Sequence, residues 1–400
     1  MPLSISPNSS LPVSPLFMPQ LDSIRFFAVL MVFSYHLLPE FWLKYLKFFD
    51  LGTAVSFFFV LSSYLLTRIL LVGRSKAEEA SIPQVQVAKL FLIRRALRIL
   101  PLYYGFLLIL VFLPGLKTSL VQGDIGWHLA FLSNFQLYAD QQWGSSIPHF
   151  WTLAVEEQFY LVWPWVILFV PIRLLPKVFL FMIGSSILLR GLCFFLLDDP
   201  TSQSVPFTIL TPMCIDSFGF GALLAYQQTF GPCSPSLFKK WLYLAIPVVL
   251  GIWVVLVQSE LLLAVWSLDR TFVGILSMAL LLKASQGFEG NGKILMENRV
   301  FLYLGKISYG IYVYHLFVPQ LYPVAVKYLS VRSVRLTGHN YLDFLAFTYN
   351  ELVWYTIYLL LTILMASASW HFFEQPINNL KRYFQYDKKI RPPKEVAVPA

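Results

Sequence analysis

Long apolar runs separated by short polar or basic stretches dominate the pattern of the chain. A helix that crosses a bilayer needs roughly 20 apolar residues, and about ten runs approach that length. These runs lie at 21–38, 51–72, 100–114, 148–171, 177–197, 207–228, 241–258, 261–283, 300–323 and 351–373. The third run is short, and 126–139 can add a partial or re-entrant helix. The pattern predicts an all-α, polytopic membrane helix bundle of about ten transmembrane helices.

The composition favours a membrane protein. Hydrophobic residues make up 57% of the 400 residues and charged residues 13%, whereas a soluble domain carries about a quarter charged residues. We expect a loosely ordered N-terminal tail over 1–20, a membrane domain over 21–376 and a basic tail over 377–400, without an appended soluble domain. The first residues are rich in Pro and Ser and lack the basic start of a cleavable signal.

Lys and Arg are concentrated in alternate loops, which predicts the orientation in the membrane. Most of them fall on one side of a ten-helix arrangement, although the basic residues at 327–335 fall on the other. This bias predicts that both termini are cytoplasmic. Basic loops orient membrane helices and contact lipid headgroups, so they also account for the net charge of +9. Nucleic acid is therefore not an expected partner. The cysteines Cys193, Cys214 and Cys233 lack metal-ligand spacing, and no metal site is predicted.

The stretch from His149 to Pro164, HFWTLAVEEQFYLVWP, places two adjacent carboxylates, Glu156 and Glu157, inside an apolar and aromatic run. An ionised carboxylate there costs several kcal/mol unless it has a partner or a wet cavity. Tyr160 lies one helical turn after Glu156 and shares its face. A functional site is one interpretation. The alternative is that the carboxylates bridge neighbouring helices, or that the helix end lies among headgroups.

Arg25 and His36 fall on one face of the first run. They are eleven residues apart, which on a helix leaves them within roughly 20° of each other and about 16 Å apart along the axis. A cation near the cytoplasmic side and an imidazole nearer the outer side suit a long anionic ligand. Alternatively, Arg25 snorkels or pairs with Asp22, and His36 is a satisfied histidine between helices.

A basic segment, AKLFLIRRALRILPLYY, precedes the third run and carries Arg94, Arg95 and Arg98. One interpretation is an amphipathic segment that binds headgroups. The other is an anion site, because the forked guanidinium groups match phosphate oxygens.

Further polar side chains interrupt the later runs. Asp216 lies in an apolar run, and the adjacent Asp269 and Arg270 do not face each other on a helix, so each needs another partner. A polar stripe in the ninth run is interpreted as helix packing, and a group after the last run as an ordinary membrane interface. The members of these two groups are Ser308, Tyr309, Tyr312 and His315, and Trp370, His371 and Glu374.

No sequence motif in the chain supports the chemistry of soluble hydrolases, zinc enzymes or nucleotide-binding folds. A histidine and carboxylates in apolar runs, together with arginines on the cytoplasmic side, suit proton abstraction from a hydroxyl. The same residues also suit a proton-coupled transporter, and composition does not separate the two.

Six sequence blocks in order resemble the integral-membrane acyltransferases called acyltransferase type 3, which include O-antigen, exopolysaccharide and peptidoglycan O-acetylases. The resemblance extends over nearly the whole chain. The blocks are LDSIRFFAVLMVFSYH (21–36), SFFFVLSSYLL (56–66), RRALRILPLYY (94–104), HFWTLAVEEQFYLVWP (149–164), LGKISYGIYVYH (304–315) and FFEQP (372–376).

The resemblance implies transfer of an acyl group, commonly acetyl from acetyl-CoA, to a hydroxyl of a carbohydrate or related acceptor, in a bacterial inner membrane. The family's R-x10-H motif falls on Arg25 and His36, its R-x-x-R motif on Arg95 and Arg98, and its E-x-x-F-Y motif begins at Glu156. Members with a hydrolase-like domain use it to pass the acyl group onward. Without such a domain, this chain would transfer directly or hand over to a separate partner protein.

Three positions depart from the family pattern. Serine stands at Ser23 and Ser63 where glycine is usual, which could tighten or narrow a helix crossing. Cys214 stands where we expect an arginine two residues before Asp216, which leaves the role of Asp216 in doubt.

The leading hypothesis is a membrane O-acyltransferase in which His36 is the general base, assisted by Glu156, while Arg25, Arg95 and Arg98 bind the CoA phosphates. An acyl-histidine intermediate is a variant of it. The rival hypothesis is a proton-coupled transporter or flippase for glycan or lipid. A non-catalytic scaffold is the third, and the retained Arg25, His36 and Glu156 argue against it.

Overall fold

The computed structural model describes residues 18–45, 53–112, 125–143, 147–197, 203–231, 234–259, 262–322, 325–326, 328 and 351–384. Within these ranges the regular structure is helical and no strand is present. The predicted all-α class is therefore confirmed. Most of both predicted tails and the basic positions Lys327, Arg332 and Arg335 lie outside the described residues.

The helices follow the predicted apolar runs closely. Their bounds are α1 Gln20–Leu37, α2 Glu40–Tyr45, α3 Ala54–Glu79, α4 Gln84–Phe112, α6 Ile125–Leu129, α7 Ser133–Asp140, α8 Phe150–Phe169, α9 Leu175–Leu196, α10 Ile215–Phe230, α11 Pro235–Gln258, α12 Leu262–Gln286, α13 Gly290–Met296, α14 Arg299–Lys306, α15 Ser308–Tyr314, α18 Glu351–Ser369 and α19 Gln375–Asn378. A π-helical turn over Trp370–Glu374 joins α18 to α19. The predicted partial helix at 126–139 is the pair α6 and α7.

Among the described residues, six helical segments are long and apolar enough to cross a membrane. They are Ala54–Glu79, Gln84–Phe112, Ile172–Leu196, Pro235–Leu256, Val265–Gln286 and Glu351–Tyr383. The predicted number of about ten is therefore not confirmed.

The other four predicted runs are helical but shorter, broken or more polar. Helix α10 has 16 residues, and the run at 300–323 is divided at Ile307 into α14 and α15. Helices α1 and α8 carry Arg25, His36, Glu156 and Glu157, which lower their apolar character. The side chains that mark a candidate site are thus the ones that make these two helices poor membrane spans by composition.

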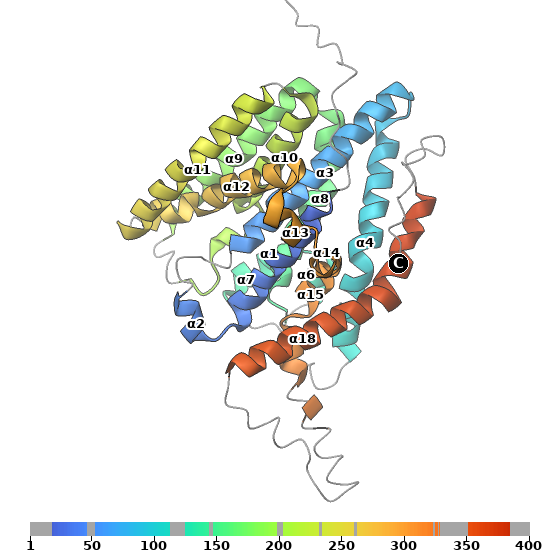
Figure 1. Cartoon of the computed structure of the whole chain (residues 1–400), viewed down its shortest axis with the longest axis vertical. Helices are drawn as coiled ribbons and strands as arrows, with labels where there is room; N and C mark the ends of the chain where they lie inside the picture. Colours follow the sequence, from blue (N-terminus) through green and yellow to red (C-terminus); the bar gives the residue numbers. More distant parts are fainter. Residues whose placement is uncertain are drawn as a thin grey trace, which may run out of the picture.

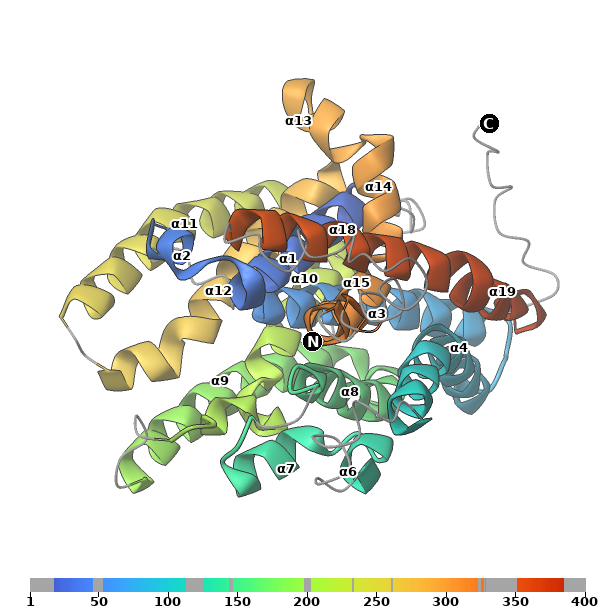
Figure 2. The ribbon, with the colours of Figure 1, turned by 90° about the horizontal axis from the view of Figure 1, so that it is seen from below.

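The helices form one bundle around α3. Helices α9, α11 and α12 gather on one side and α4 lies on the other, with α1, α3 and α8 between them (Figure 1, Figure 2). Helices α6 and α7 lie on the opposite edge of the molecule from α13 and α14 (Figure 2). Most of α3 is buried, whereas α11 exposes Trp241, Leu244 and Val255. Lipid can cover such apolar side chains, so the outer helices need no further protein layer.

Small residues permit the closest helix contacts. At Gly221 of α10, an added Cβ would lie 2.1 Å from the Val60 carbonyl oxygen of α3. Beside it, Ser63 Oγ donates a hydrogen bond of 2.6 Å to the Phe218 carbonyl oxygen. Ser23 Oγ similarly donates to the Met296 carbonyl oxygen at 2.7 Å. Both serines that replace the family's glycines therefore bond across helix contacts, which agrees with the expected tightening of these crossings.

Candidate functional site

A cavity of ≈ 120 Å³ lies among α1, α3, α4, α8 and α15. Arg25 of α1, Arg95 and Arg98 of α4, and Glu156 and Glu157 of α8 all line it. We call it the arginine cavity. The structure therefore brings together the predicted CoA-binding arginines and the predicted carboxylate. These residues come from three helices that are far apart in the sequence.

Glu156 is held by hydroxyl groups within this cavity. Its Oε1 accepts a hydrogen bond from Ser62 Oγ at 2.9 Å, and its Oε2 accepts one from the Tyr160 hydroxyl at 2.7 Å. The Arg95 guanidinium lies 5.0 Å from the centre of the Tyr160 ring, which is within the range of a cation–π interaction. The predicted placement of Glu156 and Tyr160 on one helix face is confirmed. By contrast, the buried Oε1 of Glu157 has no hydrogen-bond partner among the described residues.

Arg25 forms an ion pair with Asp22 and also lines the arginine cavity. Its Nη1 lies 2.5 Å from Oδ1 of Asp22 one turn earlier, so the ion pair considered from the sequence is present. Arg25 also lines the arginine cavity. The ion pair orients the guanidinium without removing it from the cavity.

A second cavity, of ≈ 760 Å³, surrounds His36. Its volume falls within the roughly 300–1,000 Å³ typical of small-molecule sites. We call it the histidine cavity. The other polar side chains of its wall include His149, Asp269 and Arg270. Tryptophan side chains also line it, namely Trp143, Trp151, Trp253 and Trp266.

His36 lies beside two buried histidines. The ring centres of His36 and His315 are 5.3 Å apart, and those of His149 and His315 are 4.5 Å apart. His315 Nδ1 lies 2.6 Å from the Tyr312 carbonyl oxygen, and His149 Nε2 lies 3.4 Å from the Val313 carbonyl oxygen. Because a carbonyl oxygen only accepts, these contacts put the proton on Nδ1 of His315 and on Nε2 of His149.

The other ring nitrogens of these two histidines are therefore hydrogen-bond acceptors. Nε2 of His315 and Nδ1 of His149 are buried and have no partner among the described residues. His149 was not predicted as a site residue, and His315 was expected to belong to a packing stripe. The one signal for His149 was its place at the start of the stretch that holds Glu156. Within the described ranges, no group of three His, Cys, Asp or Glu side chains is arranged to hold a metal ion.

The two cavities share part of their walls. Val55, Thr152 and Tyr312 line both. The hydroxyl groups of Thr152 and Tyr312 are hydrogen-bonded to each other, and the Tyr312 hydroxyl donates to the His149 carbonyl oxygen at 2.8 Å.

His36 and Glu156 consequently lie on different sides of this shared wall. His36 lines the histidine cavity and Glu156 the arginine cavity. The structure brings Glu156 to the arginines and His36 to the other histidines, and it does not bring the two residues to each other.

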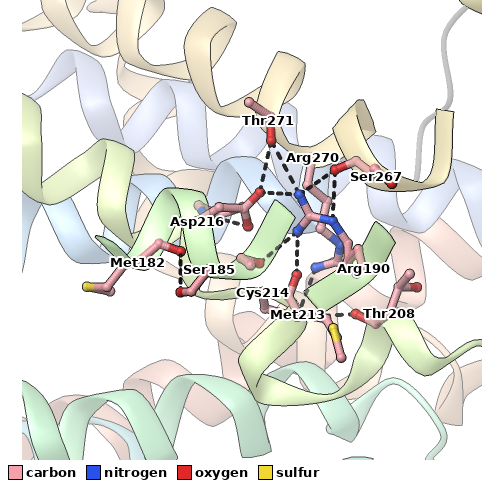
Figure 3. A network of polar contacts seen from close by, with 12 residues as sticks. Met182, Ser185, Arg190, Thr208, Met213, Cys214, Asp216, Ser267, Arg270 and Thr271 are labelled. Carbon is pink, nitrogen blue, oxygen red and sulfur yellow. Dashed lines mark hydrogen bonds and ion pairs between the residues drawn. The ribbon is translucent and has the colours of Figure 1, made fainter. Parts of the chain in front are cut away.

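Asp216 belongs to a buried network outside both cavities (Figure 3). Its Oδ2 accepts a hydrogen bond of 2.7 Å from Nη2 of Arg190, and both side chains are fully buried. Cysteine stands at position 214, where an arginine was expected. The guanidinium of Arg270 on α12 lies against it. Arg270 Nη1 is 3.0 Å from Cys214 Sγ. Arg190 was not predicted as a functional residue, because it lies within an apolar run and has no motif around it.

Comparisons with known proteins show the family of the chain. The model of an acyltransferase domain family matches residues 18–371. The chain is 28% identical to the peptidoglycan O-acetyltransferase OatA of Listeria monocytogenes, over 92% of this chain and 57% of that protein. It is 27% identical to the O-acetyltransferase OatA of Staphylococcus aureus, over 91% of this chain and 58% of that protein.

A protein of Bacillus subtilis named putative peptidoglycan O-acetyltransferase YrhL is also similar, with 27% identity over 90% of this chain and 55% of the relative. The chain thus spans between 55% and 58% of the length of these relatives. No solved structure matches it. Since the family model covers most of the chain, including Arg25, His36, Arg95, Arg98 and Glu156, the protein belongs to this family of membrane acyltransferases.

Proposed function

We propose that the protein is an integral-membrane O-acyltransferase that moves an acyl group, commonly acetyl, from acyl-CoA to a hydroxyl of a carbohydrate acceptor. One observation carries the proposal. A cavity lined by arginines and a cavity lined by histidines and tryptophans share the wall formed by Val55, Thr152 and Tyr312. Such an arrangement suits a donor and an acceptor that meet at that wall. The relatives, which are named as O-acetyltransferases, support acetyl as the group.

The arginine cavity suits the donor. Guanidinium groups bind phosphate oxygens in a forked geometry, so Arg25, Arg95 and Arg98 would hold the phosphates of acyl-CoA. The cavity is small, at ≈ 120 Å³, so the adenosine part of the donor would lie outside it. Along α1, Arg25 and His36 are separated by about 16 Å. A donor held at Arg25 must therefore be long for its thioester to approach His36.

The histidine cavity suits the acceptor. Flat aromatic side chains with a few polar groups between them bind and orient a ligand that has both apolar and polar faces, as a sugar ring does. Trp151 and Trp266 would supply stacking surfaces. The unpartnered ring nitrogen of His149, which lines the cavity, can accept a hydrogen bond from a sugar hydroxyl.

His36 would act as the general base. The acceptor oxygen attacks the thioester carbonyl carbon while His36 accepts the hydroxyl proton. The carbon–sulfur bond then breaks, and the proton passes from His36 to the CoA sulfur. The products are an acyl ester and free CoA.

Glu156 would act from the donor side. Its contacts are with Ser62 and Tyr160, so in this proposal it balances the arginine charges and fixes Tyr160 beside Arg95. This role replaces the direct assistance to His36 that the sequence led us to expect.

In the proposed orientation, the arginine cavity faces the cytoplasm, where acyl-CoA is found, and both termini are cytoplasmic. The membrane would be the bacterial inner membrane, with lipid around α9, α11 and α18. The acceptor would reach the histidine cavity from the other side. A separate partner protein that accepts the acyl group there is an alternative to direct transfer to a glycan.

The test is acyl transfer by the purified full chain in detergent. Radiolabelled acetyl-CoA is incubated with peptidoglycan fragments and other glycans, and label in the glycan is measured for the wild type and for His36→Ala. His371→Ala is the matched control, because His371 contacts Tyr303 and lines neither cavity. Transfer lost in His36→Ala and retained in His371→Ala supports the proposal. Full transfer by folded His36→Ala contradicts the mechanism, and glycan movement in liposomes without acyl-CoA would favour the transporter.

A further inference from the structure

Two arginines near the histidine cavity have very different surroundings (Figure 3). Arg190 is fully buried and ion-paired with Asp216. It also donates hydrogen bonds to the Ser267 carbonyl oxygen at 2.8 Å and to the Met213 carbonyl oxygen at 2.6 Å. The charge and donors of Arg190 are thus used inside the protein, and it lines neither cavity.

Arg270 has weak partners instead. Its Nη1 lies 3.0 Å from Cys214 Sγ, and its guanidinium carbon lies 5.9 Å from the centre of the Trp151 ring. Thiol sulfur is a weak acceptor, and a guanidinium carries five N–H donors. Among the described residues, no carboxylate forms an ion pair with Arg270. Most of its donor capacity is therefore not used by strong acceptors within the described part of the chain.

The position of Arg270 on an apolar helix means that its charge costs free energy when no ligand is bound. Arg270 lies on α12, one of the helices apolar enough to cross a membrane, and it lines the histidine cavity. A charge on such an apolar helix costs free energy unless a counter-charge or a wet cavity compensates for it. The nearest acidic residue in the sequence, Asp269, also lines the cavity. Adjacent residues on a helix point about 100° apart, so Asp269 does not face Arg270 directly. Asp216 is already paired with Arg190.

Besides Asp269, the other ionisable side chains of this wall are Tyr35, His36, His149 and Tyr312. Of all these, only the Asp269 carboxylate supplies a negative charge at neutral pH, and among the described residues it forms no ion pair with Arg270. A ligand that enters the cavity therefore meets one guanidinium backed by an indole ring, and the counter-charge that suits it is a carboxylate or a phosphate.

We propose that Arg270 is a binding site for an anionic group of the acceptor, so that the acceptor is an acidic glycan rather than a neutral one. This inference rests on the proposed function. A carboxylate or phosphate held at Arg270, in the same cavity as His36, would fix which hydroxyl reaches the base. Arg270 would thereby act as a specificity residue.

The test measures binding, so it does not depend on acyl transfer. The first probe is the methyl glycoside of N-acetylmuramic acid, which carries a carboxylate, and its control is the same glycoside with that carboxylate converted to a primary amide. The second pair is N-acetylglucosamine 1-phosphate and methyl N-acetylglucosaminide. Binding to the full chain in detergent is followed by tryptophan fluorescence, because Trp151 lies against Arg270.

We expect the wild type to bind one of the two anionic probes more tightly than its neutral control, and this preference to weaken as salt is added. A preference for the carboxylate or for the phosphate identifies the source of the anion. Arg270→Gln should raise the Kd of the anionic probe by about 10- to 100-fold, the range for a hydrogen bond to a charged group. It should leave the Kd of the neutral probe within about twofold, since that probe makes no such bond. Arg270→Lys should retain part of the preference.

Arg173→Gln is the matched control, because Arg173 is exposed and lines neither cavity. Equal binding of anionic and neutral probes by the wild type would overturn the inference even if Arg270→Gln fails to fold. Equal weakening of the binding of both probes by Arg270→Gln would overturn it as well.

If the wild type transfers no acetyl group but still prefers the anionic probe, the proposed function fails while the anion site stands. If transfer proceeds without such a preference, the anion site alone fails.

Discussion

The hydroxyl groups of Thr152 and Tyr312 are hydrogen-bonded to each other in the wall that separates the arginine cavity from the histidine cavity. The Tyr312 hydroxyl also donates to the carbonyl oxygen of His149. Both side chains are buried, so the pair cannot exchange its bonds for bonds to bulk water. It fixes the backbone at the start of α8, and with it the place of the His149 ring.

Replacing Thr152 should therefore separate the effect of the hydroxyl from that of side-chain shape. Thr152→Val keeps the shape but loses the contacts of the hydroxyl with Tyr312 and with the His149 carbonyl oxygen, and a hydrogen bond of this kind is worth about 1 kcal/mol. We expect roughly fivefold to tenfold slower acyl transfer, because an energy of that size in a transition state changes the rate by about that factor. The measurement is kcat for transfer at saturating donor.

Thr152→Ser is the control for this prediction. It keeps the hydroxyl and loses one methyl group, so its kcat should stay nearer the wild-type value. If Thr152→Ser is as slow as Thr152→Val, the methyl packing and not the hydroxyl pair is what matters at this wall.

The sequence predicted much of the donor side of the site. Helical periodicity placed Glu156 and Tyr160 on one face, and the structure joins them by a hydrogen bond. Arg95 and Arg98 were expected at the cytoplasmic approach, and both line the cavity that contains Glu156. These predictions succeeded because they depend on spacing within one helix and on the high cost of charge in an apolar run.

The histidine side was harder to predict. His36, His149 and His315 come from α1, the start of α8 and the end of α15. Periodicity predicts which face of a helix is polar but not which other helix that face meets. The same reason explains why Arg190 was missed as the partner of Asp216, since the two lie on α9 and α10.

Arg95 and Arg98 should matter through the phosphates of the donor. We compare acetyl-CoA with S-acetylpantetheine, which has the same thioester arm but no phosphate. Arg95→Gln with Arg98→Gln should raise KM for acetyl-CoA by about 100-fold or more, because charge-assisted bonds are worth about 1.5–3 kcal/mol each and each 1.4 kcal/mol is about tenfold. KM for S-acetylpantetheine should change little.

Arg94→Gln is the control for the arginine pair. Arg94 donates to the carbonyl oxygens of Lys381 and Phe384 at 3.2 and 3.0 Å and does not line the cavity. Similar KM increases for both donors in the Arg95 and Arg98 double variant would argue against phosphate binding by these arginines.

Glu156 should be more sensitive to amide substitution than its neighbour. In Glu156→Gln one carboxylate oxygen becomes an NH₂ group, which cannot accept the bond that Ser62 or Tyr160 donates. We expect a loss of roughly tenfold in kcat/KM for acetyl-CoA, since a bond to a charged group contributes about 1.5–3 kcal/mol. The measurement is initial-rate kinetics with acetyl-CoA as the varied substrate.

Glu157→Gln is the matched control in the same cavity. Oε1 of Glu157 has no partner among the described residues, so an amide there costs no bond at that atom. A larger loss from Glu157→Gln than from Glu156→Gln would contradict the assignment of Glu156 as the carboxylate of the donor site.

Asp216 and Arg190 should couple strongly in stability. Removing one partner of a buried ion pair leaves an uncompensated charge and costs about 3–5 kcal/mol. Asp216→Asn and Arg190→Gln should each lower the thermal unfolding temperature in detergent, and the double variant should lose less than the sum of the single losses. Additive losses would mean that the two side chains act independently. His36-dependent transfer should persist in whatever fraction stays folded, because the network lies outside both cavities.

Gly221 should tolerate no larger side chain, because helix α3 lies directly against it. An alanine Cβ at Gly221 would lie 2.1 Å from the Val60 carbonyl oxygen and 2.8 Å from the Tyr64 backbone nitrogen. Backbone atoms cannot move aside as a flexible side chain can, so α3 and α10 would have to separate. We expect Gly221→Ala to reduce the yield of folded protein and to lower its unfolding temperature, measured by size-exclusion chromatography and thermal scanning in detergent.

Gly184→Ala is the control, because Gly184 is also in a helix and has nothing within 4 Å of an added Cβ. Alanine favours a helix over glycine by about 1 kcal/mol, so Gly184→Ala should be neutral or stabilising. Equal damage from both substitutions would mean that glycine itself, and not the contact of α3 with α10, is required in these helices. Damage at Gly221 alone would show that this close approach holds together the two helices beside the arginine cavity and the Asp216 network.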